Sequence, residues 1–228
     1  MTPRISTPPL LEIPFLSDII AIRRDLHAHP ELAFHEARTA ALVARELAAY
    51  GLEVHRDLAG TGVVGVLKKG TGQGHGQSDG PRAIGLRADM DALPIMEVGQ
   101  ADYASTQPGR MHACGHDGHT AMLLGAARYL SAYRDRLDFE GVVYFIFQPA
   151  EEVGGGAQKM LENGLFRRFP MDAVFGLHNW PGLPVGRIAA FPGPIMAGSS
   201  CFEITVRGQG CHAGMPHQGI DALVVASH

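Results

Sequence analysis

Short apolar runs alternate with segments of helical periodicity along this chain, and this alternation constrains its fold more than any other feature. The run Gly141–Phe147 (GVVYFIF) is the most hydrophobic of them. Three further runs have the same short, glycine-bounded or strongly apolar character: Val63–Leu67, Ala83–Leu86 and Ala173–Leu177. Such runs predict buried strands. Strands separated by helices are typical of α/β proteins. We therefore predict an α/β fold with a mostly parallel sheet flanked by helices.

Helices are expected where apolar residues recur at intervals of three or four. Ile19, Ile22 and Leu26 have this spacing before Pro30. The same spacing predicts helices over 37–50 and 118–133, and a short helix from about 156 to the Asn163-Gly164 pair. Sheets of this kind gather their chemistry at the carboxyl ends of the strands. The segments after Leu86, Phe147 and Leu177 are therefore the first places to look for a functional site.

The composition changes near Phe191, where prolines and a glycine/serine run begin. We place a domain boundary there, with 1–191 as one domain and 192–228 as the start of a second. After the boundary we expect a strand over Phe202–Val206 and a helix from Ile220 to His228. So few elements are too little to bury a core of their own.

Several classes of protein are excluded by composition. The net charge is −4, so the chain lacks the basic excess that nucleic acid binding requires. No uncharged apolar run has the length of a membrane span. The N-terminus, Met1–Pro14, does not read as a signal peptide, and the three cysteines form no regular disulfide framework. We expect a cytoplasmic protein, with a mobile surface loop over Gly70–Gly80.

The densest cluster of chemistry-bearing residues is His112–His119, with three histidines and one cysteine before a predicted helix. Thiolate and imidazole are preferred ligands of zinc, and carboxylates bind zinc or manganese. Cys114 and His116 are two residues apart, so in an extended loop they face the same side. His119 lies in the first helical turn and can point elsewhere. The alternative interpretation is a polar capping loop with incidental histidines.

Two adjacent carboxylates, Glu151 and Glu152, follow the most hydrophobic strand. Neighbouring side chains in a non-helical turn point in different directions, so one can bind a metal while the other moves a proton. This division suits hydrolysis. The alternative is an acidic helix N-terminus, which the helix dipole favours by itself.

His178 follows a third strand, and Asp89 and Asp91 follow a fourth. A lone histidine beside apolar residues is often a core group, but its place at a strand end favours a ligand. The two aspartates could orient ligand histidines through hydrogen bonds, or they could be turn residues before Pro94.

A dinucleotide-binding turn, a serine nucleophile elbow and a phosphate-binding loop are not predicted. The glycines of Gly60–Gly65 have the spacing of a dinucleotide fingerprint, but they lead into a strand rather than a helix, so they predict a turn. There is no nucleophile elbow, which weakens a serine hydrolase as an alternative, and no Walker loop.

The chain resembles the M20 family of metallopeptidase-like amidohydrolases, in particular hippurate hydrolases, N-acyl-amino-acid hydrolases and auxin-conjugate hydrolases. The resemblance runs through nearly the whole chain, in the segments 23–27, Pro30-Glu31, 87–94, 112–124, 148–152, 177–179 and 210–217.

This resemblance implies two divalent metal ions held by Cys114, His116, Glu152 and His178. Zinc or manganese is favoured, and nickel or cobalt is compatible with such ligands. It also implies that Glu151 is the general base and acid. His212, in a small lid domain, would reach a substrate oxygen, commonly across a homodimer interface. The expected reaction is hydrolysis of the amide bond of a small N-acyl amino acid.

In the family the lid continues, and the chain then returns to the catalytic domain with a further strand and a last ligating histidine. The resemblance thus implies that 1–191 is the N-terminal part of the catalytic domain and 192–228 an incomplete lid or dimerisation domain. We expect a C-terminally truncated form. The alternative function is an inactive metal-binding or interaction fragment of such an enzyme.

Overall fold

A computed structural model describes residues 13–70, 82–198 and 200–228. The predicted loop over Gly70–Gly80, apart from its first residue, and residues 1–12 lie outside the described residues. Within them, the elements follow in the order α1 (Leu16–Ala28), α2 (Ala37–Ala49), β1 (Glu53–Leu58), β2 (Gly62–Lys69), β3 (Ala83–Asp89), α3 (His116–Ala132), a 3-10 turn (Arg134–Arg136), β4 (Gly141–Gln148), α4 (Gly156–Glu162), α5 (Leu165–Arg168), β5 (Ala173–Gly176), a second 3-10 turn (Pro216–Gln218) and α6 (Ala222–Ser227).

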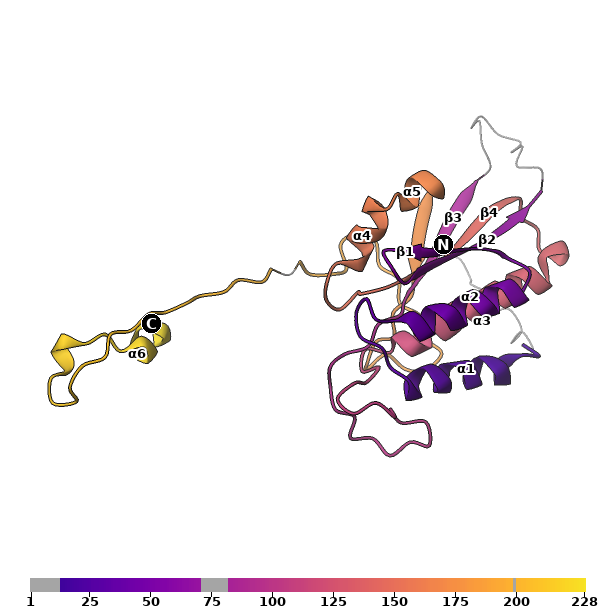
Figure 1. Cartoon of the computed structure of the whole chain (residues 1–228). Coiled ribbons are helices and arrows are strands. Elements are labelled where there is room, and N and C mark those ends of the chain that lie inside the picture. Colours follow the sequence, from indigo (N-terminus) through magenta and orange to yellow (C-terminus); the bar gives the residue numbers. More distant parts are fainter. Residues whose placement is uncertain (1–12, 71–81, 199) are drawn as a thin grey trace, which may run out of the picture. The chain divides into compact units, whose positions relative to one another are not determined.

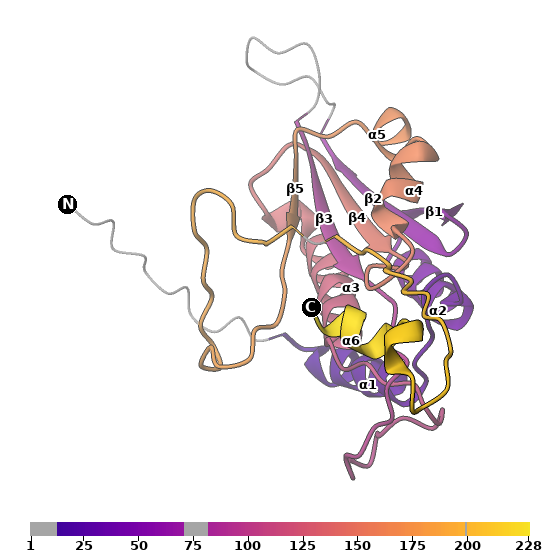
Figure 2. The same ribbon diagram turned by 90° about the vertical axis from the view of Figure 1, so that its left-hand side faces the viewer.

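The strands form a five-stranded sheet in the order β1-β2-β4-β3-β5 (Figures 1 and 2). β3 pairs in parallel with both β4 and β5, whereas β2 pairs antiparallel with β1 and β4. Four strands therefore share one direction and only β2 runs against them. The α/β class is confirmed, and the sheet is mixed because β1 and β2 form a hairpin.

Helices cover both faces of the central strands. On one face, α1, α2 and α3 bury a core that includes Leu47, Leu124, Phe145 and Phe147. On the other, Met160 and Leu165 of α4 and α5 pack against β1, β2 and β4, and Figure 1 shows the two helical layers on either side of the sheet. Alternate residues of β4 enter opposite cores, as a strand period of two requires.

Most predicted elements are present with shifted bounds. β1 was not expected, because its sequence, EVHRDL, is polar and only Leu58 in it is buried. The turn predicted at Gly60–Gly65 is confirmed at its first residues, since Gly60 lies between β1 and β2 with φ +92°. The strand expected over Phe202–Val206 is wrong. Phe202 and Ile204 are exposed, and no neighbouring strand pairs with them in the described part of the chain.

The chain divides into two compact units, Met1–Pro181 and Gly182–His228. The boundary between 191 and 192 remains a prediction. In the second unit, the helix expected from Ile220 is present as α6, where the Asp221 carboxylate accepts the amide of Leu223. None of the described helices is long and apolar enough to span a membrane.

Candidate metal centre

The carboxyl ends of three neighbouring strands meet the start of α3 within the first unit. Asp89 ends β3, Glu151 and Glu152 follow β4, and His178 follows β5. Parallel strands bring such groups to one edge of the sheet, which is why the sequence could predict their proximity. The helix α3 begins at the same edge and adds Cys114 and His116.

Gly115 makes the turn that presents Cys114 and His116. It adopts φ +88°, a left-handed conformation that glycine tolerates, and α3 begins at the next residue. A Cβ at this position would lie 2.5 Å from Oδ1 of Asn179. Cys114 and His116 do face one region, as predicted, but through a left-handed glycine and a helix start rather than an extended loop.

The four side chains predicted as metal ligands lie close together at this edge of the sheet: Cys114, His116, Glu152 and His178. One group, whose ligand atoms all lie within 4.8 Å of one another, contains Cys114, His116 and His178. Cys114 Sγ is 3.5 Å from His178 Nε2. A second group, within the same limit, joins His116 to Glu151 and Glu152. A third group joins His116 to Asp89 and His119. His116 belongs to all three groups and is therefore the centre of the cluster.

Both histidines present Nε2 to the cluster. Nδ1 of His116 lies 2.8 Å from the backbone oxygen of Asp91, and Nδ1 of His178 lies 2.6 Å from that of Asn179. A backbone oxygen only accepts, so each Nδ1 donates, and in the neutral ring the lone pair is on Nε2. A ligand histidine is oriented in the same way in metalloproteins.

Two buried atoms at the centre have no hydrogen-bond partner: Nε2 of His116 and Oε1 of Glu152. They are 3.8 Å apart. Buried polar atoms nearly always have a partner, so an unpartnered lone pair beside an unpartnered carboxylate oxygen calls for a cation between them. The residues present therefore fit a divalent metal centre.

Asp91 and Asp89 make hydrogen bonds to the segments that carry the predicted ligands. The carboxylate of Asp91 accepts the backbone amides of Glu151 and Glu152, at 2.9 and 3.0 Å. Asp89 contacts Nδ1 of His119 at 2.7 Å and accepts a bond from Arg87 at 2.7 Å. Both aspartates also lie beside the predicted ligand His116: Oδ1 of Asp91 is 3.4 Å from its Nδ1, and Oδ2 of Asp89 is 3.6 Å from its Nε2.

Electrostatics at the centre favour a cation. Burial opposes ionisation of Asp89, but the hydrogen bond from His119 and the charge of Arg87 lower its pKa to about 2. Burial, together with the negative charge of Glu152, raises the pKa of the Cys114 thiol to about 12. A bound cation would offset that negative charge and favour the thiolate.

The sequence did not assign a role to His119, which the structure places beside the cluster. Its Nε2 accepts the backbone amide of Asn179 at 3.0 Å, and its ring packs edge-on against His178 at 4.5 Å between centroids. His119 therefore connects β3 to the segment after β5. A helix that begins at His116 places the residue three positions later on the same face, but the sequence predicted a start two residues later.

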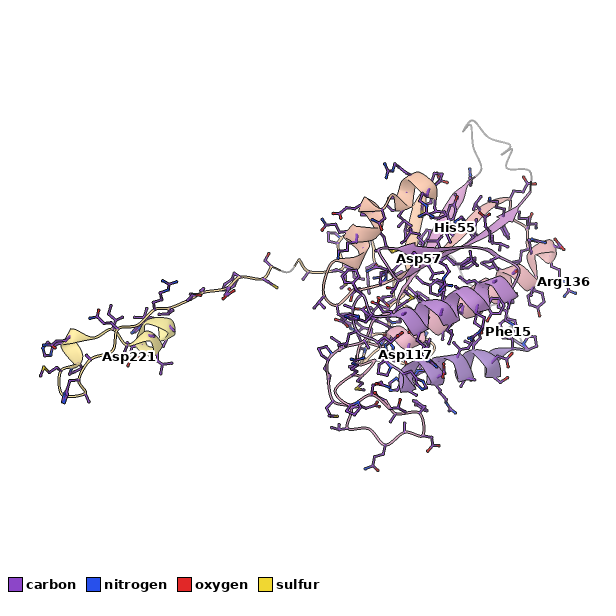
Figure 3. The ribbon with its side chains drawn as sticks, viewed as in Figure 1. Phe15, His55, Asp57, Asp117, Arg136 and Asp221 are labelled. Carbon is purple, nitrogen blue, oxygen red and sulfur yellow. The ribbon has the colours of Figure 1, made fainter. Side chains whose placement is uncertain are left out.

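A second buried polar network joins α1 to α3. Asp117, labelled in Figure 3, contacts Nδ1 of His27 and Nε of Arg23, both at 2.8 Å. His112 is buried nearby with neither ring nitrogen partnered. Burial lowers the pKa of His112 to about 4. This network anchors the segment that carries Cys114 and His116.

His212 lies in the second unit, exposed, where its Nδ1 accepts the amide of Gly214 at 3.0 Å. Its predicted contact with substrate stays a prediction.

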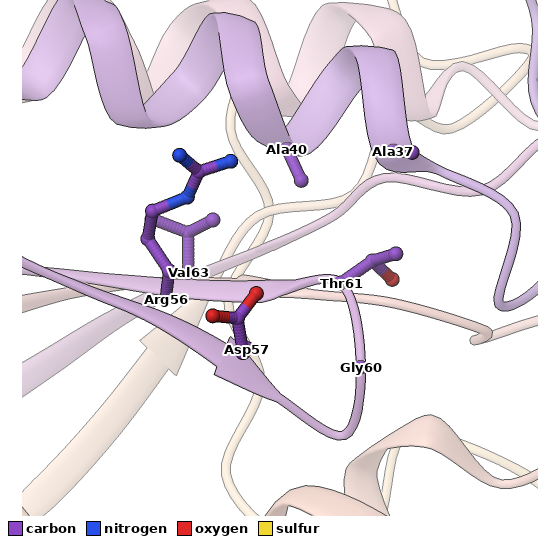
Figure 4. A pocket seen from close by; sticks show the side chains of 7 residues that line it. All are labelled: Ala37, Ala40, Arg56, Asp57, Gly60, Thr61 and Val63. Carbon is purple, nitrogen blue, oxygen red and sulfur yellow. The ribbon is translucent and has the colours of Figure 1, made fainter.

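A pocket of about 100 Å³ lies in the first unit, between α2 and the β1–β2 hairpin (Figure 4). It contains none of the predicted site residues and is lined by Ala37, Ala40, Arg56, Asp57, Gly60, Thr61 and Val63.

The chain is similar to several known proteins. An N-acyl-L-amino acid amidohydrolase of Geobacillus stearothermophilus is 45% identical over 92% of this chain and 54% of its own length. The hippurate hydrolase of Campylobacter jejuni is 47% identical over 90% of this chain and 51% of its own length. The crystal structure of the Bacillus subtilis YXEP protein, a dinuclear metal-binding peptidase from the M20 family, has 44% identity and a TM-score of 0.66, covering 76% of this chain and 46% of that one.

The chain spans about half the length of the curated relatives it matches. A sequence profile described as peptidase family M20/M25/M40 matches residues 85–227, which include every predicted site residue. The resemblance inferred from the motifs is thereby confirmed, and the chain belongs to peptidase family M20/M25/M40.

Proposed function

We propose that this chain carries the metal centre of a hydrolase that cleaves the amide bond of N-acyl amino acids. The observation that supports this most directly is the pair of unpartnered buried atoms, His116 Nε2 and Glu152 Oε1, with Cys114 and His178 beside them. The substrate class is proposed from relatives that are named N-acyl-L-amino acid amidohydrolase and hippurate hydrolase.

Four side chains would hold two divalent ions: Cys114, His116, Glu152 and His178. A thiolate, two imidazoles and a carboxylate suit zinc, and the carboxylate also suits manganese. When bound, such ions polarise a carbonyl group and lower the pKa of water towards neutrality.

Glu151 is proposed as the general base and acid. Its side chain is 40% exposed, whereas that of Glu152 is 20% exposed, so Glu151 is the more accessible of the two to water and substrate. Its Oε2 lies 3.9 Å from His116 Nε2, at the edge of the cluster. Glu151 would take a proton from the attacking water and pass it to the leaving amine.

Three further parts of the proposal concern the whole protein. His212 would donate a hydrogen bond to the developing oxyanion. The functional form would be a homodimer. A cytoplasmic location is proposed because Cys114, Cys201 and Cys211 are all free thiols.

The test measures metal content and hydrolysis together. Elemental analysis of the metal-loaded chain is expected to give two divalent ions per chain, and a chelator is expected to abolish release of glycine from N-benzoylglycine. Glu151→Gln is expected to keep both metals and lose about 100-fold or more of the turnover. Glu162→Gln, an exposed glutamate on α4, is the matched control.

The outcomes separate the two functions that the sequence left open. Hydrolysis that survives the chelator, or Glu151→Gln with full turnover, would refute the proposed mechanism. Two bound metals without hydrolysis by the wild-type chain would instead support a metal-binding fragment.

A further inference from the structure

Three consecutive backbone amides after β4 donate hydrogen bonds to two buried carboxylates. The amide of Ala150 donates to Oε1 of Glu36 at 2.9 Å. The next two amides, of Glu151 and Glu152, donate to the two oxygens of Asp91. The turn that presents both glutamates is thus held through its backbone, not through their side chains.

Ala150 has an unusual conformation that needs such support. It is fully buried and has φ +50°, in the left-handed region that residues with a Cβ rarely adopt. Backbone of this kind persists only where the surrounding structure holds it, and it often occurs at functional sites. After this left-handed step both following carboxylates reach His116 Nε2, at 3.9 Å for Glu151 and 3.8 Å for Glu152, but Glu151 is 40% exposed and Glu152 only 20%.

Glu36 is built into the fold as an acceptor for this turn. It precedes α2, and its side chain has no exposed surface. Besides Ala150, its Oε1 accepts the amide of Phe34 at 3.0 Å, and its Oε2 accepts the hydroxyl of Thr61 at 2.6 Å. Thr61 lies in the β1–β2 turn beneath the start of α2 (Figure 4). Both carboxylate oxygens are therefore occupied.

We propose that Glu36 is a positioning residue, which fixes the left-handed turn at Ala150 and thereby directs Glu152 inward and leaves Glu151 accessible. Glu36 is separated in sequence from every predicted ligand, and its hydrogen bond to the turn after β4 is made to the backbone amide of Ala150. The inference rests on the proposed function for the roles of the two glutamates, but the conformation of the turn can be measured without any metal.

Glu31 offers a matched control. Its carboxylate also accepts two backbone amides, those of Arg38 and Thr39 in the first turn of α2, at 3.0 and 2.8 Å. Glu31→Ala removes the same number of backbone hydrogen bonds close to the same helix, but none of them in the turn after β4. A general loss of stability would affect both variants.

Glu36→Gln is the conservative variant. A glutamine oxygen can accept the amides of Phe34 and Ala150, and its NH₂ group can donate to the hydroxyl of Thr61. Glu36→Ala leaves both amides without an acceptor in the interior. If Glu36→Ala does not fold, Glu36→Asp replaces it, because a carboxylate one methylene shorter keeps its charge but withdraws from Ala150.

The first measurement is hydrogen exchange of the segment 149–155 in the metal-free chain, followed by mass spectrometry. Glu36→Ala is expected to accelerate this exchange about tenfold or more, while Glu36→Gln and Glu31→Ala leave it near the wild-type rate. The second measurement is the visible absorption spectrum of bound Co²⁺, which reports the geometry of its ligands. Only Glu36→Ala is expected to change it.

Exchange in Glu36→Ala within twofold of wild type would overturn the proposal, and so would equal acceleration of 149–155 by Glu31→Ala. An unchanged Co²⁺ spectrum in Glu36→Ala would also contradict it. If the wild-type chain binds no Co²⁺, the proposed function fails instead, and the exchange rates in the metal-free chain still decide whether Glu36 holds the turn.

Discussion

Gly115→Ala is expected to damage the candidate centre for two separable reasons. The residue has φ +88°, and a Cβ added there would lie 2.5 Å from Oδ1 of Asn179. The side chain of Asn179 cannot withdraw freely, because it lies against His119. The substitution therefore combines backbone strain with displacement of the Asn179 side chain from its part-buried contact with His119.

The structure offers controls that separate these contributions. Left-handed backbone costs a residue with a Cβ about 1 to 2 kcal/mol, and displacement of the Asn179 side chain from this polar contact costs about 1 kcal/mol more, so we expect Gly115→Ala to lose about 2 to 3 kcal/mol. Gly109 has φ +75° with no atom within 4 Å of its Cβ position, so Gly109→Ala is expected to lose only the first part. Gly118 is inside α3 with free space, so Gly118→Ala is expected to gain up to about 1 kcal/mol.

The assay is equilibrium unfolding in urea, monitored by circular dichroism, for the three variants and the wild type. The expected order of unfolding free energy is Gly118→Ala, wild type, Gly109→Ala and then Gly115→Ala. Bound Co²⁺ is expected to change its spectrum in Gly115→Ala alone. A Gly115→Ala variant as stable as Gly109→Ala would refute the close approach to Asn179.

Three further predictions concern the fold and its pH dependence in the metal-free chain. Phe145→Ala, in the core, is expected to lose about 3 to 5 kcal/mol in urea unfolding, whereas Phe175→Ala, 56% exposed, is expected to change by less than about 1 kcal/mol. The pKa of Asp89 is lowered from 3.8 to about 2, so its ionised form stabilises the fold above pH 4. About 2 kcal/mol is then lost as the pH falls towards 2. Asp89→Asn is expected to flatten this part of the stability profile, and an unchanged profile would contradict the assignment. The pKa of His112 is lowered from 6.5 to about 4, so acidification through this range costs the folded state up to about 3 kcal/mol. His112→Leu is expected to reduce that loss when unfolding is followed between pH 7 and pH 4.

The α/β class could be predicted because its signals are local. Short apolar runs such as Gly141–Phe147 bury both faces of a strand, and glycine or proline ends them. β1 escaped prediction because an edge strand in which only Leu58 is buried has no apolar pattern. β2 forms a hairpin with β1 and therefore runs antiparallel to its neighbours in the sheet. The periodicity of apolar residues does not reveal the direction of a strand.

The candidate centre was predictable for a different reason. Groups that follow parallel strands meet at one edge of the sheet, so Asp89, Glu152 and His178 could be brought together without knowing a single contact. The role of His119 could not be predicted from the sequence. It depends on α3 beginning at His116, whereas the predicted helix begins at residue 118.

By itself, the sequence determined the fold class, the edge of the sheet where chemistry gathers and the set of residue types that suits a divalent metal. The tertiary structure alone decided how those residues are held. Glu36 and Ala150 are 114 positions apart, and their contact depends on how α2 packs beside the end of β4. Hydrogen bonds between distant backbone and buried carboxylates leave no periodic pattern in a sequence, because they depend on packing in three dimensions.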